Sequence, residues 1–137
     1  MKCSELQIGD YVRLKRTNEV VGVFEIDGDR NVINNEPDGY CSEKNIAVDD
    51  IEPITLTLEI LERNGFELRN GFLYHRIDDK PHHYDFKLEN GGVFTSEGYT
   101  LQCCIYHLTI RYVHELQHAL RICRLNDFAD NFKVEER

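Results

Sequence analysis

The sequence lacks long hydrophobic runs. It has no tryptophan, one methionine and three prolines in 137 residues. No apolar stretch approaches the roughly 18–20 residues that a membrane-spanning helix needs, so we expect no membrane segment. The N-terminal residues also lack the apolar centre of a signal peptide, and we expect no secretion.

Positive charge is scarce. There are 16 Lys and Arg residues against 25 Asp and Glu residues, which gives a formal net charge of −9. Binding to nucleic acid needs cations that replace the phosphate counterions, so this balance argues against a nucleic-acid partner. Residues 1–52 alone carry 12 acidic and 6 basic residues. That excess leaves open an acidic mimic of nucleic acid as an alternative function.

Paired cysteine motifs are also missing. The five cysteines are odd in number and contain no Cys-x-x-Cys spacing, so neither a disulfide framework nor a zinc ribbon is indicated. We therefore expect reduced thiols and a cytoplasmic protein.

Residues 1–52 predict a small β module. Strand-like runs cover 10–16, 19–26 and 30–33, with a turn sequence at 27–29 and a last strand within 45–51. Short strands without helix favour a small barrel or half-barrel. The segment from Leu6 to Asn34 also resembles the opening of SH3-like barrels, which implies an SH3-like fold for this module.

Residues 53–137 predict an α+β module. Thr57 is a suitable N-cap for a short helix that ends at Asn64-Gly65, with Phe66 as the hydrophobic contact beyond it. An antiparallel β-meander is expected over 72–77, 83–89, 93–95 and 99–105. A long C-terminal helix over 107–124 would cover one sheet face, and a polar tail follows. The predicted fold class is therefore α+β.

The C-terminal helix contains one motif with chemical content. Residues 114–118 read His-Glu-Leu-Gln-His, the HExxH pattern of zinc peptidases. Histidines four residues apart on a helix can bind one zinc ion, and the glutamate can act as general base on a zinc-bound water. A zinc-dependent hydrolase with ligands His114 and His118 and with Glu115 as catalytic base is thus one alternative.

Three observations favour another interpretation of this motif. The position six residues after His118 is Arg124, so the third zinc ligand of some zincins is missing. Two arginines on the same helix face oppose a divalent cation. The histidines also lie opposite the apolar side formed by Val113, Leu116 and Leu120, and this predicts that they face solvent.

The leading hypothesis is therefore a non-enzymatic interaction protein with no cofactor. Its candidate binding face is the polar side of the predicted helix, which would present histidines and arginines to a protein partner. The five residues of this predicted face are His107, Arg111, His114, His118 and Arg121. The sequence does not determine the oligomeric state.

Two segments also carry a family resemblance. The helix IEPITLTLEILERNGFEL and the later IRYVHELQHALRI, with a meander between them, resemble small uncharacterised proteins of prophages and mobile elements in gut bacteria. This family has no known activity, cofactor or partner. The resemblance implies a phage or mobile-element origin and a final helix used for packing or recognition.

Overall fold

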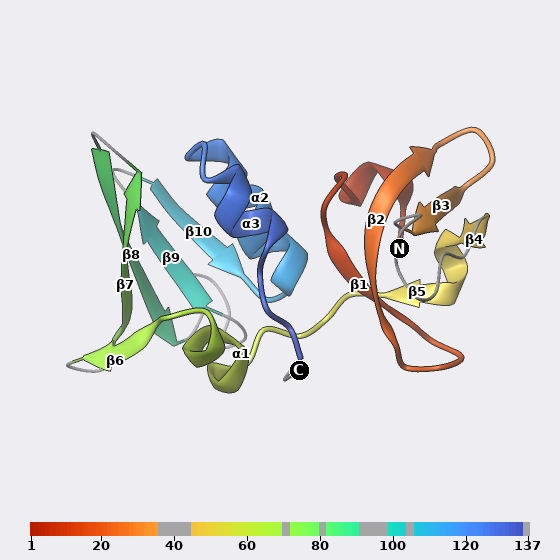
Figure 1. Ribbon diagram of the computed structural model, residues 1–137. Coiled ribbons are helices and arrows are strands. Elements are labelled where there is room, and N and C mark those ends of the chain that lie inside the picture. The colour runs from red at the N-terminus through yellow and green to blue at the C-terminus, as the bar shows by residue number, and fades with distance from the viewer. Residues whose placement is uncertain (36–44, 70–71, 80–81, 91–98, 104–105, 136–137) are drawn as a thin grey trace.

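The chain folds into three layers, in which two antiparallel sheets enclose a pair of helices (Figure 1). The computed structural model describes residues 1–35, 45–69, 72–79, 82–90, 99–103 and 106–135. The architecture is α+β, as the sequence predicts. One apolar cluster lies within the N-terminal sheet, and a second lies between the helices and the other sheet.

The N-terminal sheet has the strand order β4-β3-β2-β1-β5. The first three predicted strands of this module are confirmed, with ends shifted by a residue or two. The single strand expected within 45–51 is instead two short strands, β4 and β5, separated by a 3-10 turn. Short 3-10 turns, η1 (Cys3–Glu5) and η2 (Val48–Asp50), come before β1 and β5 respectively. The strands are β1 (Tyr11–Leu14), β2 (Val20–Asp27), β3 (Val32–Asn35), β4 (Ile46–Ala47) and β5 (Ile51–Glu52).

Strand β2 pairs with β1 in its first half and with β3 in its second half. Its register against β3 shifts between Val23 and Glu25, so Phe24 lies at a β-bulge. A bulge bends its strand and redirects a side chain. Strand alternation places Phe24 on the face opposite to the buried Val21 and Val23, and Phe24 is 43% exposed.

The second sheet is an antiparallel meander with the order β10-β9-β8-β7-β6. The meander is confirmed, but the sequence did not predict its two edge strands, β6 and β10. The predicted strand at 93–95 lies outside the described residues. The strands are β6 (Glu67–Arg69), β7 (Phe72–Asp79), β8 (His82–Asn90), β9 (Tyr99–Cys103) and β10 (Tyr106–Ile110).

Helix α1 (Leu58–Arg63) forms as its local sequence predicts. The side chain of Thr57 accepts a hydrogen bond from the backbone N–H of Ile60 at 3.3 Å, which caps the first turn. Gly65 has φ +91° after the last turn, and the backbone N–H of Phe66 donates a hydrogen bond to the Leu61 carbonyl at 3.1 Å. Phe66 is 2% exposed, so this C-cap also anchors the helix to the core.

Helix α2 (Val113–Ile122) lies between the two sheets and buries its apolar side against the meander. Val113, Leu116 and Leu120 have no exposed surface. The same cluster contains Leu73 of β7 and Leu88 of β8. The apolar side of the predicted helix is therefore confirmed.

The predicted start of this helix is wrong. Residues 106–110 form strand β10, and His107 pairs there with Gln102 of β9. Apolar and polar residues alternate here, with apolar side chains at Tyr106, Leu108 and Ile110. This alternation is the period of a strand, and the prediction of a helix from residue 107 did not take it into account. The chain turns at Arg111 and Tyr112 and enters the helix at Val113.

The C-terminal tail packs into the core, with a short helix α3 (Asn126–Asp130) against α2. Ala129, Phe132 and Val134 are buried, so the tail that the sequence predicted as polar contributes to the core. Every helix in the described part of the chain is too short or too polar to cross a bilayer.

Replacing Leu116 by alanine tests the orientation of α2. Because Leu116 is fully buried, Leu116→Ala should lower the free energy of unfolding by about 2–5 kcal/mol. Urea denaturation measures the loss. Ile122 of the same helix is 75% exposed, so Ile122→Ala should change it by less than about 0.5 kcal/mol. Equal effects of the two substitutions would contradict this orientation.

Candidate functional site

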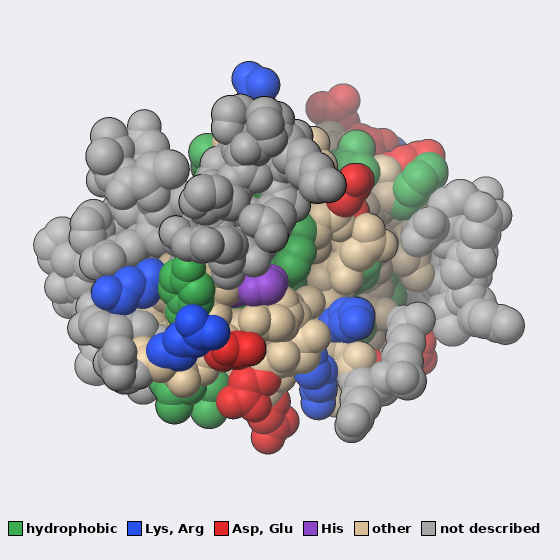
Figure 2. Space-filling model, turned by 60° about the vertical axis from the view of Figure 1, so that its left-hand side comes forward, with side chains coloured by type: hydrophobic (Ala, Val, Ile, Leu, Met, Phe, Trp, Pro, Cys, Tyr) green, Lys and Arg blue, Asp and Glu red, His purple; other side chains and the backbone are tan. Residues whose placement is uncertain are grey.

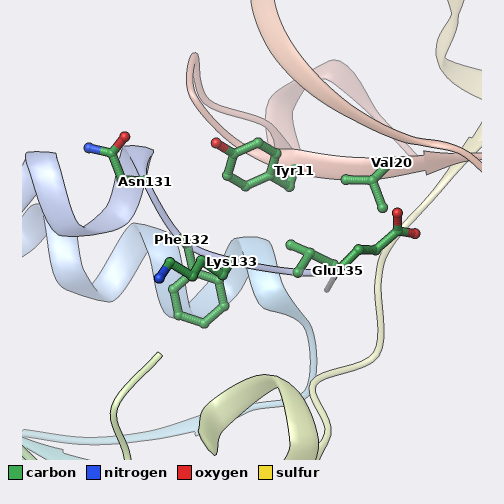
Figure 3. A pocket seen from close by; sticks show the side chains of 7 residues that line it. Tyr11, Val20, Asn131, Phe132, Lys133 and Glu135 are labelled. Atoms are coloured by element: carbon green, nitrogen blue, oxygen red, sulfur yellow. The ribbon is translucent and has the colours of Figure 1, made fainter. Parts of the chain in front are cut away.

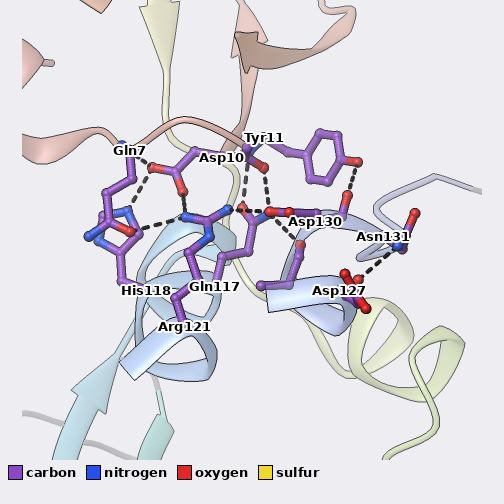
Figure 4. A network of polar contacts seen from close by, with 11 residues as sticks. Gln7, Asp10, Tyr11, Gln117, His118, Arg121, Asp127, Asp130 and Asn131 are labelled. Carbon is purple, nitrogen blue, oxygen red and sulfur yellow. Dashed lines mark hydrogen bonds and ion pairs between the residues drawn. The ribbon is translucent and has the colours of Figure 1, made fainter. Parts of the chain in front are cut away.

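The polar side of α2 faces the β module, and its contacts centre on one buried carboxylate (Figure 4). Asp10 has no exposed surface. One oxygen, Oδ1, accepts a hydrogen bond from Nη1 of Arg121 at 2.6 Å. The other, Oδ2, lies 2.6 Å from Nε2 of His118 and accepts the backbone N–H of Gln7 at 2.7 Å. A buried charge is tolerated when it is paired and hydrogen-bonded in this way.

Gln117 makes a second buried connection between α2 and the β module. Its Oε1 accepts the backbone N–H of Tyr11 at 3.0 Å, and its Nε2 donates to the Gly9 carbonyl at 3.0 Å. The same Nε2 donates to the Ala129 carbonyl of α3 at 2.8 Å. One fully buried amide therefore joins three segments of the chain.

Gly9 is required at this contact. Its φ of +95° is a conformation that glycine adopts without strain. A Cβ at this position would lie 2.5 Å from Oδ1 of Asp130 and 2.8 Å from Nη2 of Arg121. The missing side chain thus allows the backbone before β1 to approach α2.

Glu115 of the HExxH motif caps the start of α2. Its Oε1 accepts the backbone N–H groups of Arg111 at 3.0 Å and Tyr112 at 3.1 Å. These N–H groups precede the helix, and a carboxylate there also interacts favourably with the helix dipole. The glutamate that the sequence offered as a catalytic base therefore holds the backbone in place.

His114 is buried, contrary to the prediction that it faces solvent. Its side chain lies between two rings: Tyr112 stacks on it at a centroid distance of 5.8 Å, and His118 meets it edge-on at 5.5 Å. Only 5% of the residue is exposed, and its Nδ1 has no hydrogen-bond partner among the described residues. Burial lowers the pKa of His114, and the negative charge of Asp10 opposes this shift in part.

A shallow pocket of ≈ 370 Å³ opens over this end of α2. Both histidines of the motif line it, together with Glu5 and Arg111. Arg111 is exposed, and its guanidinium lies 5.7 Å from the centre of the Tyr112 ring. Three residues of the predicted binding face, Arg111, His114 and His118, thus line one pocket.

The predicted binding face is therefore wrong as a continuous exposed helix face. His107 belongs to strand β10, and His114 is enclosed by its neighbours. Arg121 and His118 pair with Asp10, so the β module covers the side of α2 that the sequence assigned to solvent. Of the five residues, Arg111 alone is exposed among those whose side chains the structure describes.

The structure also bears on the alternative zinc pair. His114 and His118 do lie side by side and line one pocket. Among the described residues, no group of three His, Cys, Asp or Glu side chains is arranged to hold a metal ion. The pair is thus placed as the motif predicts, without a third protein ligand in the described part of the chain.

Sequence reasoning missed Asp10 and Gln117, which contribute most of the polar contacts between the two modules. The only local signal near Asp10 is the pair Gly9-Asp10, which is typical of a turn and does not indicate a partner on α2. Comparison with protein-family models, curated proteins and solved structures found no match to this chain.

Replacing Asp10 tests the polar contact between the modules. Asp10→Asn removes the charge that pairs with Arg121, and breaking a buried pair of this kind costs about 3–5 kcal/mol of unfolding free energy. Thermal or urea denaturation measures the loss. Asp50→Asn is the matched control because Asp50 is exposed, and it should stay within about 0.5 kcal/mol of the parent. A similar stability for both variants would show that Asp10 does not hold the modules together.

The buried imidazole of His114 predicts a pH dependence of stability. Its pKa in the folded protein lies below the ordinary value of about 6.5, so the unfolded chain binds its proton more readily. Stability from this group is therefore complete above about pH 6.5 and is lost as the pH falls. Compared with His114→Phe, the parent should lose more unfolding free energy between about pH 8 and about pH 5. Parallel pH profiles of unfolding free energy for the parent and His114→Phe would contradict a lowered pKa of His114 in the folded protein.

Proposed function

We propose that this chain is a non-enzymatic interaction protein that binds a protein partner in the cytoplasm. The proposal rests on a groove at the junction of the β module and α3. Ile8 and Phe24 expose apolar side chains there, with 63% and 43% of their surface accessible. Exposed apolar side chains that line a concave surface are typical of protein-binding sites.

The groove, which we call the Ile8–Phe24 groove, has a volume of ≈ 300 Å³. The β module provides one wall and α3 provides the other. It is lined by Ile8, Gly9, Tyr11, Gly22, Val23, Phe24, Asp130 and Asn131. Phe24 lies at the bulge in β2, and bulges are frequent next to functional sites.

A neighbouring pocket of ≈ 360 Å³ extends this surface along the junction (Figure 3). Tyr11 and Asn131 line both hollows, and the hydroxyl of Tyr11 donates to the Asp130 carbonyl at 2.6 Å. Two adjoining hollows with a shared aromatic wall suit an extended segment of a partner protein.

The charge around the groove favours a basic partner segment. The side chain of Asp130 is 53% exposed, and its contact with Arg121 is long, at 3.4 Å. The chain as a whole carries a formal charge of −9. We therefore expect a segment with an apolar side chain next to lysine or arginine, which complementary charge would help to orient.

The contacts of the HExxH motif favour this proposal over a zinc hydrolase. A general base must reach a metal-bound water, but Glu115 bonds two backbone N–H groups before α2. This capping role accounts for the presence of Glu115 in the sequence.

Several alternatives from the sequence remain predictions. An acidic nucleic-acid mimic would need a continuous acidic surface, whereas the face in Figure 2 shows described side chains of both signs interspersed.

The strand order and the 3-10 turn before β5 favour an SH3-like interpretation of the β module. SH3-like barrels are recurrent scaffolds for peptide binding. The prophage origin rests on the family resemblance alone.

Charge substitution in the groove tests the proposed function. The double variant Ile8→Glu/Phe24→Glu places two carboxylates in the apolar part of the surface, where they should abolish partner binding. The full-length chain would be used as bait in an extract of its source cells, and any partner would then be purified for affinity measurement. We expect a loss of affinity of at least about 100-fold, because apolar anchors dominate such contacts.

The control is Leu68→Glu/Ile122→Glu, which changes two exposed apolar residues outside the groove. It should keep the partner and its affinity. Identical partners and affinities for all three proteins would refute the Ile8–Phe24 groove as the binding site.

A further inference from the structure

We propose that His114 and His118 form a two-imidazole site for a late first-row divalent metal ion such as Zn²⁺, Ni²⁺ or Cu²⁺. The site lies in the pocket at the start of α2, apart from the Ile8–Phe24 groove. Its role is binding rather than hydrolysis, because Glu115 is held by the backbone. Solvent in the open pocket supplies the remaining ligands.

The first reason is the state of His114. The residue is 95% buried, yet it lines the pocket and the fold supplies no partner for its Nδ1 among the described residues. Buried polar atoms nearly always have a partner, so an unpaired ring nitrogen requires an explanation. A neutral imidazole is also the commonest metal ligand in proteins, and burial keeps this one uncharged.

The second reason is the orientation of His118. Its Nε2 lies 2.6 Å from the carboxylate of Asp10, which is itself fixed by Arg121 and the Gln7 backbone. Histidines that bind metals usually donate their other N–H to a carboxylate in this way, which fixes the ring and increases its basicity. Asp10 is thus a positioning residue for His118.

The two rings are also separated by a suitable distance. Their centroids are 5.5 Å apart and the rings are nearly perpendicular, with an interplanar angle of 75°. Two imidazoles that share one ion at metal–nitrogen distances of about 2.0–2.1 Å have centroids roughly 5 Å apart. The observed separation of the two rings is thus close to that of two imidazoles that share one ion.

The electrostatic surroundings favour a cation more than the sequence suggested. Arg121 is neutralised by Asp10 at 2.6 Å and approaches Asp130 at 3.4 Å. Arg111 lies over the Tyr112 ring. Asp10, Glu115 and Glu5 all act on His114 as negative charges. Two nitrogen ligands among these carboxylates suit Cu²⁺, Ni²⁺ and Zn²⁺, whereas Ca²⁺ and Mg²⁺ prefer all-oxygen sites.

Metal titration of the untagged full-length chain tests this site. His82→Ser/His83→Ser is the reference protein, because these substitutions remove two adjacent histidines from outside the motif. Calorimetry with Ni²⁺ and with Zn²⁺ should give one ion per chain. His114→Gln and His118→Gln should each weaken binding by at least about tenfold. The Cu²⁺ electron paramagnetic resonance spectrum should show coupling to two imidazole nitrogens.

The matched control is His75→Gln, because His75 is a partly buried histidine in contact with aromatic rings and lies outside the pocket. It should bind the ion as the reference protein does. Circular dichroism without metal establishes that each variant is folded, and either motif variant alone is sufficient for the comparison. The proposal would be overturned if the reference protein showed no saturable metal binding. It would also be overturned if a folded His114→Gln or His118→Gln variant bound the ion with unchanged affinity.

Discussion

The buried carboxylate of Asp10 is the constraint on which the layered arrangement depends. It leaves water completely, and this is tolerated because Arg121, His118 and the Gln7 backbone occupy its oxygens. Both side-chain partners come from adjacent turns of α2. Their position fixes the rotation of the helix about its axis, so the apolar side must face the meander when the polar side meets the β module. Gln117 reinforces the same orientation.

The polar stripe of α2 was misinterpreted because a polar helix face usually borders water. Here it borders a second polar surface within the same chain. Asp10 and Arg121 are separated by 111 residues, and no local pattern connects them. A pairing of this kind follows from the docking of the two modules, which the periodicity of a single helix does not encode.

Elements with local signals were predicted well. Helix α1 has a capping threonine, a glycine at positive φ and an apolar residue beyond it, and each of these acts within a few residues. The strands of the β module follow from turn residues and alternation. Strand β10 was not predicted because its five residues lead almost directly into α2. The helical period was therefore extended backward across Arg111. Strand β6 has only three residues, all exposed, and thus no apolar pattern to reveal it.

The HExxH pattern shows why a motif must be interpreted through its contacts. Histidines four apart lie on one side of any helix, and a glutamate in the first turn is also a common capping residue. Both requirements are met here without catalysis, since Glu115 bonds the backbone and His118 bonds Asp10. The imidazole pair stays in place beside these contacts, and the pairing with Asp10 reduces the repulsion expected from Arg121. Metal binding and hydrolysis are therefore separate questions for this helix.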